Sequence, residues 1–160
     1  MWNKKNLRFE TRQIHGGYNV DQTGSRGVAI YPTAAYHFKS CDYAANLFEL
    51  SEPGNIYTRL HNPTTAAYEQ RIASLYNAVG ALAVSSGMAA IFITVTALAE
   101  AGDNIVAAPF LYGGTYNLFG VTFPKMGLEV TFIDQDASDE EWAAAFRPNT
   151  KLVFGETLSN

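Results

Sequence analysis

The pattern of apolar and polar positions changes near residue 62. Before that point the chain shows no sustained periodicity, and clusters of Gly, Pro, Asn and Ser interrupt it as turns. The spacing of apolar residues predicts one short helix over 42–50. A stretch this rich in turns does not form a compact domain by itself. We therefore expect residues 1–61 to be an extended N-terminal arm that packs on other structure.

After residue 62, helices and short apolar strands alternate. Asn62-Pro63 is typical of a helix start, because Asn caps free N–H groups and Pro has no N–H to lose. That helix is expected to run towards Tyr76, and further helices are predicted over 88–101, 115–126 and 140–146. Strands are predicted over 81–84, 104–108, 129–133 and 152–154.

This alternation predicts an α/β fold with a mostly parallel sheet and helices on both faces. The helix predicted over 88–101 is apolar around nearly its whole circumference, so we expect it to be buried, and Gly102 to end it. The chain stops at Asn160, just past a predicted strand. We therefore expect residues 62–160 to be the first part of a larger domain, and the chain to be the front part of a longer protein or one of two pieces that assemble.

Composition narrows the class of protein. The chain has 11 Lys and Arg against 15 Asp and Glu, and 48% of its residues are apolar. The high apolar fraction excludes intrinsic disorder. The slightly acidic net charge argues against a nucleic-acid partner, because binding to phosphates needs a basic face. There is no apolar run of about 18 residues, so no membrane span is expected. A single cysteine, Cys41, excludes an internal disulfide, and a cytoplasmic location is expected.

The segment Ser85-Ser86-Gly87-Met88 is a candidate anion site. It lies between a predicted strand and a predicted helix, where the first N–H groups of the helix have no internal partner and the helix dipole is positive. Gly87 allows close approach of an anion, and the Ser86 hydroxyl adds a donor, which suits a phosphate. An ordinary strand-to-helix turn with a serine cap explains the same residues.

Two further segments carry candidate groups. Tyr57-Thr58-Arg59 offers a guanidinium that matches two phosphate oxygens, although an arginine in a loop is usually only solvated. Tyr112-Gly113-Gly114-Thr115 follows a predicted strand, so the Tyr112 ring is expected at the carboxyl edge of the sheet, where it either stacks on a flat cofactor or closes the core. Dinucleotide, nucleoside-triphosphate, hydrolase and zinc motifs are absent from the sequence.

Taken in order, these motifs resemble the pyridoxal-phosphate-dependent enzymes of Cys/Met metabolism, a family with the fold type I, aspartate-aminotransferase-like architecture. The likeness runs from about residue 8 to the last residue. Within the family, segments of the arm are similar to the O-acetylhomoserine sulfhydrylase branch. The segments that carry the resemblance are 11–18, 44–48, 52–59, 62–64, 85–90, 111–115 and 156–160.

The resemblance implies roles for particular residues. It implies that Gly87 and Met88 give backbone N–H groups to the phosphate of pyridoxal 5'-phosphate (PLP), beside Ser86, and that Tyr112 stacks on the cofactor ring and assists proton transfer. It also implies that Asn160 lies near the 3-oxygen of the ring, with Glu156 on the same loop. Tyr57 and Arg59 would reach the phosphate from a neighbouring subunit, in a dimer that shares its sites and assembles into a homotetramer.

The activity implied is replacement of the acetoxy group of O-acetylhomoserine by sulfide or a thiol, which gives homocysteine or methionine and acetate. Cystathionine γ-synthase, cystathionine γ-lyase and methionine γ-lyase reactions on the same scaffold remain alternatives. The family's Schiff-base lysine, in a Ser-x-Thr-Lys segment, and its ring-nitrogen aspartate have no counterpart in these 160 residues. A non-catalytic piece that lacks this lysine is therefore the third hypothesis.

Overall fold

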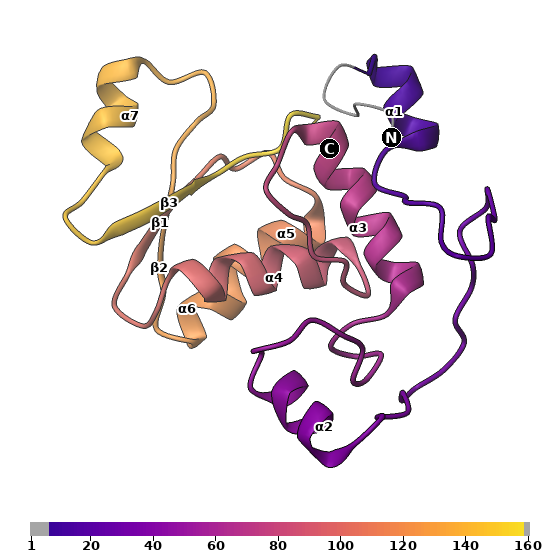
Figure 1. Ribbon diagram of the computed structural model, residues 1–160. Coiled ribbons are helices and arrows are strands. Elements are labelled where there is room, and N and C mark those ends of the chain that lie inside the picture. The colour runs from indigo at the N-terminus through magenta and orange to yellow at the C-terminus, as the bar shows by residue number, and fades with distance from the viewer. Residues whose placement is uncertain (1–6, 159–160) are drawn as a thin grey trace. The chain divides into compact units, whose positions relative to one another are not determined.

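The computed structural model describes residues 7–158, which fall into two compact units that divide between Ala83 and Val84 (Figure 1). Helix α3 belongs to the first unit. The boundary that we predict at residue 62 is a different one, since it separates the N-terminal arm from the large domain in the complete protein. That boundary stays a prediction.

The first unit contains three helices among long loops, α1 (Phe9–His15), α2 (Cys41–Phe48) and α3 (Pro63–Tyr76). The predicted helix near 42–50 is confirmed, and Ser40 caps it, since the Ser40 side chain accepts a hydrogen bond from the Tyr43 N–H. The predicted start of α3 is confirmed, because the Asn62 side chain accepts a hydrogen bond from the Thr64 N–H. Helix α1 was not expected from the pattern.

The loops of the arm are fastened to the start of α3 by side-chain hydrogen bonds. Thr64 Oγ1 accepts from the Tyr31 N–H and donates to the Ala29 carbonyl, at 2.9 Å in each case. The buried Asn62 side chain also donates to the Tyr31 carbonyl. The residues that begin the helix therefore also hold the extended segment, which explains how a stretch without periodicity adopts a defined path.

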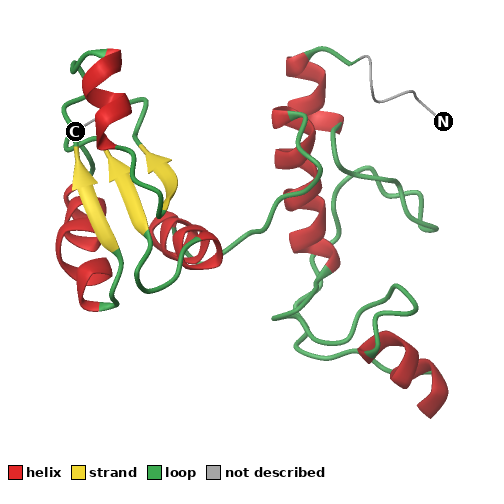
Figure 2. Cartoon of the chain, turned by 90° about the vertical axis from the view of Figure 1, so that its left-hand side faces the viewer, coloured by secondary structure: helices red, strands yellow, loops and turns green. Residues whose placement is uncertain are grey.

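The second unit is a three-stranded parallel sheet with helices around it (Figure 2). Its strands are β1 (Asn104–Ala107), β2 (Glu129–Phe132) and β3 (Thr150–Phe154), in the order β2-β1-β3. Helix α4 (Gly87–Leu98) precedes β1, and α7 (Asp139–Ala145) connects β2 to β3. Between β1 and β2 the chain forms α5 (Gly113–Asn117), the π-helix η2 (Leu118–Thr122) and α6 (Phe123–Lys125).

The core of the second unit lies between the sheet and the helices that flank β1. Figure 1 shows α4 and the α5–α6 segment on one side of the strands and α7 on the other. Val95 of α4, Ile105 of β1 and Phe119 and Phe123 after it are buried together. The predicted parallel α/β architecture is confirmed in this unit.

The expectation that the helix after Gly87 is buried on all sides is wrong for the structure described. Val95 is buried, but Phe92 is 37% exposed, Ile93 43% and Leu98 60%. The physical reason is that one stripe of α4 packs against β1 and the following helix, whereas the described residues do not cover the rest. The helix ends at Leu98, and Gly102 lies in the turn beyond it at a φ of +96°.

The expected strand over 81–84 is also wrong, since this segment pairs with no strand among the described residues. A strand needs a neighbour for its backbone groups, and the three described strands pair with one another and not with this segment. The Ala83 N–H donates instead to Glu69 Oε1 at 2.8 Å. Within residues 7–158, no helix is long and apolar enough to cross a bilayer.

Candidate functional site

The N-terminus of α4 is an open helix end that follows an extended segment. Ser86 caps it, since Ser86 Oγ accepts a hydrogen bond from the Ala89 N–H at 3.1 Å. The Gly87 and Met88 N–H groups belong to the first turn, which has no carbonyl acceptors inside the helix. A Cβ added at Gly87 would meet no atom within 4 Å. Ser86, Gly87 and Met88 thus lie at the N-terminus of a helix, and their role as an anion site stays a prediction.

The loop after β1 lies against this helix end. The buried Thr115 hydroxyl donates to Met88 Sδ at 3.8 Å, and a Cβ added at Gly114 would lie 3.4 Å from the same sulfur. Tyr112, just before these residues, is 56% exposed. An aromatic ring and a helix N-terminus thus lie at one edge of the sheet, the carboxyl end of β1, where parallel α/β sheets bind ligands.

Glu156 joins the same edge from the neighbouring strand. It follows β3 by two residues, and its Oε2 accepts a hydrogen bond from the Tyr112 N–H at 2.9 Å. Since β1 and β3 are adjacent and parallel, their carboxyl ends bring together two residues 44 positions apart. The structure therefore unites Ser86, Gly87, Met88, Tyr112 and Glu156, whereas Asn160 lies outside the described residues.

Tyr57 and Arg59 lie together in the first unit. The Arg59 guanidinium is 5.7 Å from the centroid of the Tyr57 ring, and both side chains are exposed. The segment is anchored by a bridge between Tyr57 and Ala35 and by a hydrogen bond from the Thr58 hydroxyl to the Thr33 carbonyl. Within residues 7–158 the Arg59 guanidinium makes no ion pair, so it is available to an anion from outside this unit.

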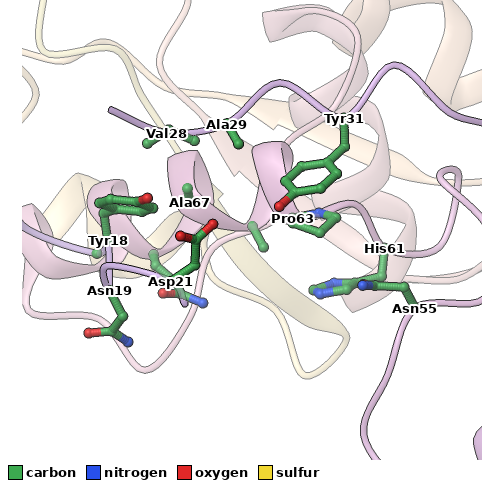
Figure 3. Close-up of a pocket in the computed structure, with 13 residues that line it drawn as sticks. Tyr18, Asn19, Asp21, Val28, Ala29, Tyr31, Asn55, His61, Pro63 and Ala67 are labelled. Carbon is green, nitrogen blue, oxygen red and sulfur yellow. The ribbon is translucent and has the colours of Figure 1, made fainter. Parts of the chain in front are cut away.

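A cavity of about 300 Å³ in the first unit contains none of the predicted site residues (Figure 3). Asp21, Tyr31 and His61 are among its lining residues. Hydrogen bonds from the side chain and the backbone of Thr23 lower the pKa of Asp21 below its ordinary value. Across the described part of the chain, no group of three or more His, Cys, Asp or Glu side chains is arranged to hold a metal.

Two features of the site were missed by sequence reasoning. The resemblance placed Glu156 on the cofactor-facing loop but gave it no partner, and Thr115 had no role of its own. No spacing rule links residues 44 positions apart, so only the register of β1 against β3 reveals the first contact. The contact of Thr115 with Met88 was equally hidden, because it joins two separate helices.

Curated proteins match nearly the whole of this chain. A homocysteine synthase from Schizosaccharomyces pombe is 48% identical over 153 residues, which are 95% of this chain and 35% of that protein. O-acetyl-L-homoserine sulfhydrylase 1 from Thermus thermophilus is 49% identical over 155 residues, 96% of this chain and 37% of that protein. The chain thus spans little more than a third of the length of these curated relatives.

A solved structure shows the same fold. The crystal structure of a putative O-acetylhomoserine (thiol)-lyase from Campylobacter jejuni, solved with N'-pyridoxyl-lysine-5'-monophosphate, matches with a TM-score of 0.90 and 41% identity. The match covers 97% of this chain and 37% of the Campylobacter jejuni chain. The family model described as Cys/Met metabolism PLP-dependent enzyme matches residues 10–160. This confirms the resemblance and the fold type, and the chain belongs to the family of Cys/Met metabolism PLP-dependent enzymes.

Proposed function

We propose that the protein containing this chain is a PLP-dependent transferase that replaces the acetoxy group of O-acetylhomoserine with sulfide or a thiol. The products are homocysteine, or methionine when the thiol is methanethiol, and acetate. The observation that carries this proposal is the 48–49% identity to a homocysteine synthase and an O-acetylhomoserine sulfhydrylase across nearly the whole chain. A cytoplasmic location stays part of the proposal.

The residues at the sheet edge fit PLP. The first N–H groups of α4 have no carbonyl acceptor within the helix and are suited to hold a phosphate, with the helix dipole and the Ser86 hydroxyl beside them, and a side chain is absent at Gly87. The exposed Tyr112 ring, on the loop that contacts Met88, supplies a flat surface for a pyridine ring. When bound, PLP supplies the electron sink that stabilises negative charge developing on the carbon skeleton of the substrate.

The chain's own groups then orient the reaction. Tyr112 Oη lies on an exposed side chain, so it is free to hold or move a proton between substrate carbons. Tyr57 and Arg59 form a paired donor set suited to phosphate oxygens. We propose that they serve the site of a neighbouring subunit, in a dimer within a homotetramer.

Product analysis of the full-length protein tests this proposal. With PLP, O-acetylhomoserine and sulfide, homocysteine and acetate should form in equal amounts. Parallel reactions with O-succinylhomoserine and cysteine, with cystathionine and with methionine cover the other reactions of the family. No homocysteine from O-acetylhomoserine, or turnover confined to one of these other substrates, would overturn the proposal.

A pair of tyrosine variants tests the role of the site. Tyr112→Phe should lower kcat/KM by about 100-fold, because it removes a hydroxyl that takes part in proton transfer. Tyr116→Phe is the matched control, since Tyr116 is 49% exposed one helical turn later and its ring stacks on Phe132. The control should stay within about twofold of the parent. Equal effects of the two changes would contradict the role given to Tyr112.

A further inference from the structure

We propose that Glu156 is a positioning residue, which sets the place of the Tyr112 ring by holding the backbone N–H of Tyr112. The inference rests on the proposed function for the role of Tyr112, but the contact itself is a feature of the fold. Glu156 Oε2 lies 2.9 Å from the Tyr112 nitrogen.

The Tyr112 backbone needs such a partner. Tyr112 is the residue just before α5, with φ of −51° and ψ of 136°, and no side chain of the loop caps the helix there. Its carbonyl enters the helix by accepting from the Tyr116 N–H, whereas its own N–H lies outside the helical ladder. Glu156 supplies the acceptor from the adjacent strand, so the carboxylate fixes the point where the loop turns into the helix.

The surrounding chain does not replace this attachment. Leu111 on one side and Thr115 on the other are buried and therefore held, but Gly113 and Gly114 lie between Tyr112 and Thr115. A Cβ added at Gly113 would meet nothing within 4 Å, whereas one added at Gly114 would lie 2.6 Å from Tyr112 Cε1, so the ring rests on Gly114. Glycine backbones have more conformational freedom than any other. Without Glu156, the Tyr112 N–H loses this acceptor, and the ring is then held from one side, by the first turn of α5, which begins with two glycines.

The consequence for the site is a loss of ring position. A stacking ring and a proton-transferring hydroxyl both depend on geometry, and a misplacement of about 1 Å can cost 100-fold in rate. The same loop contacts Met88 at the N-terminus of α4 through Thr115. Glu156 therefore bears on cofactor binding and on turnover, although it acts through the backbone of another residue.

Three variants of the full-length protein separate this role from others. Glu156→Gln keeps an acceptor oxygen at the same reach, Glu156→Ala removes it, and Glu156→Asp keeps the charge but is one methylene shorter. Glu140→Ala is the matched control, because Glu140 is an exposed carboxylate in the first turn of α7. The measurements are the Kd of the apoenzyme for PLP, the circular dichroism of bound PLP, kcat and KM, and the apoprotein Tm.

Glu156→Ala and Glu156→Asp should each weaken PLP binding by about tenfold and reduce the dichroism of the bound cofactor. Their kcat should fall more than their KM rises, while Glu156→Gln and Glu140→Ala should stay within about threefold of the parent. If Glu156→Ala does not fold, as its Tm reports, Glu156→Asp and Glu156→Gln decide between the outcomes.

Unchanged PLP affinity and dichroism in Glu156→Ala or Glu156→Asp would overturn the inference. Damage in Glu156→Gln equal to that in Glu156→Ala would also overturn it, because the charge would then act on the ligand directly. PLP binding needs no substrate, so these results stand apart from the proposed function. Failure of that function appears instead as a parent protein that binds PLP but forms no homocysteine.

Discussion

At the scale of single residues, Gly17 shows how closely the arm approaches α3. Its φ is +71°, and a Cβ added there would lie 2.1 Å from the backbone nitrogen of Arg71. The Arg71 guanidinium in turn donates to the Gly16 carbonyl at 3.0 Å. The glycine is therefore required twice, by backbone conformation and by the closeness of a helix backbone that cannot move aside cheaply.

Gly17→Ala in the full-length protein should lower the free energy of unfolding by about 3 kcal/mol or more, because strain and overlap add. Gly24→Ala is the control, since Gly24 has a φ of +72° but a Cβ there would meet nothing within 4 Å. It should cost about 1 kcal/mol from backbone strain alone. Urea unfolding of both variants measures the difference, and equal losses would refute the close approach.

At the scale of elements, Asn104 joins all three strands of the sheet. It is fully buried on the central strand, its Nδ2 donates to Thr131 Oγ1 of β2 at 3.0 Å, and its Oδ1 accepts from Thr150 Oγ1 of β3 at 2.8 Å. A buried polar side chain is stable when its hydrogen bonds are satisfied, as they are here. The cross-strand bonds help to fix the register at the start of each strand.

Asn104→Ala should lower the free energy of unfolding by about 3 kcal/mol, because three side-chain hydrogen bonds are lost, with Thr131 Oγ1, with Thr150 Oγ1 and with the Glu129 carbonyl. Asn149→Ala removes a single hydrogen bond, from Asn149 Nδ2 to the Gly102 carbonyl in an exposed turn, and should cost about 1 kcal/mol. Denaturant unfolding of the full-length variants tests this order. A milder effect at Asn104 than at Asn149 would contradict the role given to the buried amide.

At the scale of the whole molecule, the proposed exchange of Tyr57 and Arg59 between subunits predicts complementation. Arg59→Ala and Tyr112→Ala should each lose most activity as separate full-length proteins. Refolded together, they should recover about a quarter of the parental activity, because half of the random dimers are hybrids and each hybrid has one intact site. Each variant refolded alone is the control. No recovery in hybrids shown by mass to have formed would mean that both residues serve the site of their own chain.

The sequence predicted the elements that local chemistry dictates. The Asn62-Pro63 start of α3 and the three strands of the sheet are confirmed, since caps and short apolar runs act over a few residues. The family likewise follows from ordered motifs, and the matches over residues 10–160 confirm it. Gly87 and Met88 were placed at a helix N-terminus for the same local reason.

Other features depend on which segments meet in space. The segment 81–84 has the composition of a strand but has no neighbouring strand among the described residues. Helix α4 is apolar on all sides, but the described residues cover one stripe of it and leave the rest exposed. The bond from the Tyr112 N–H to Glu156 exists because β1 and β3 are adjacent. Short-range patterning thus determined the start of α3, the three strands of the sheet and the helix N-terminus at Gly87. Tertiary structure alone decided burial, pairing and the Tyr112–Glu156 contact, because these depend on partners far away in the chain.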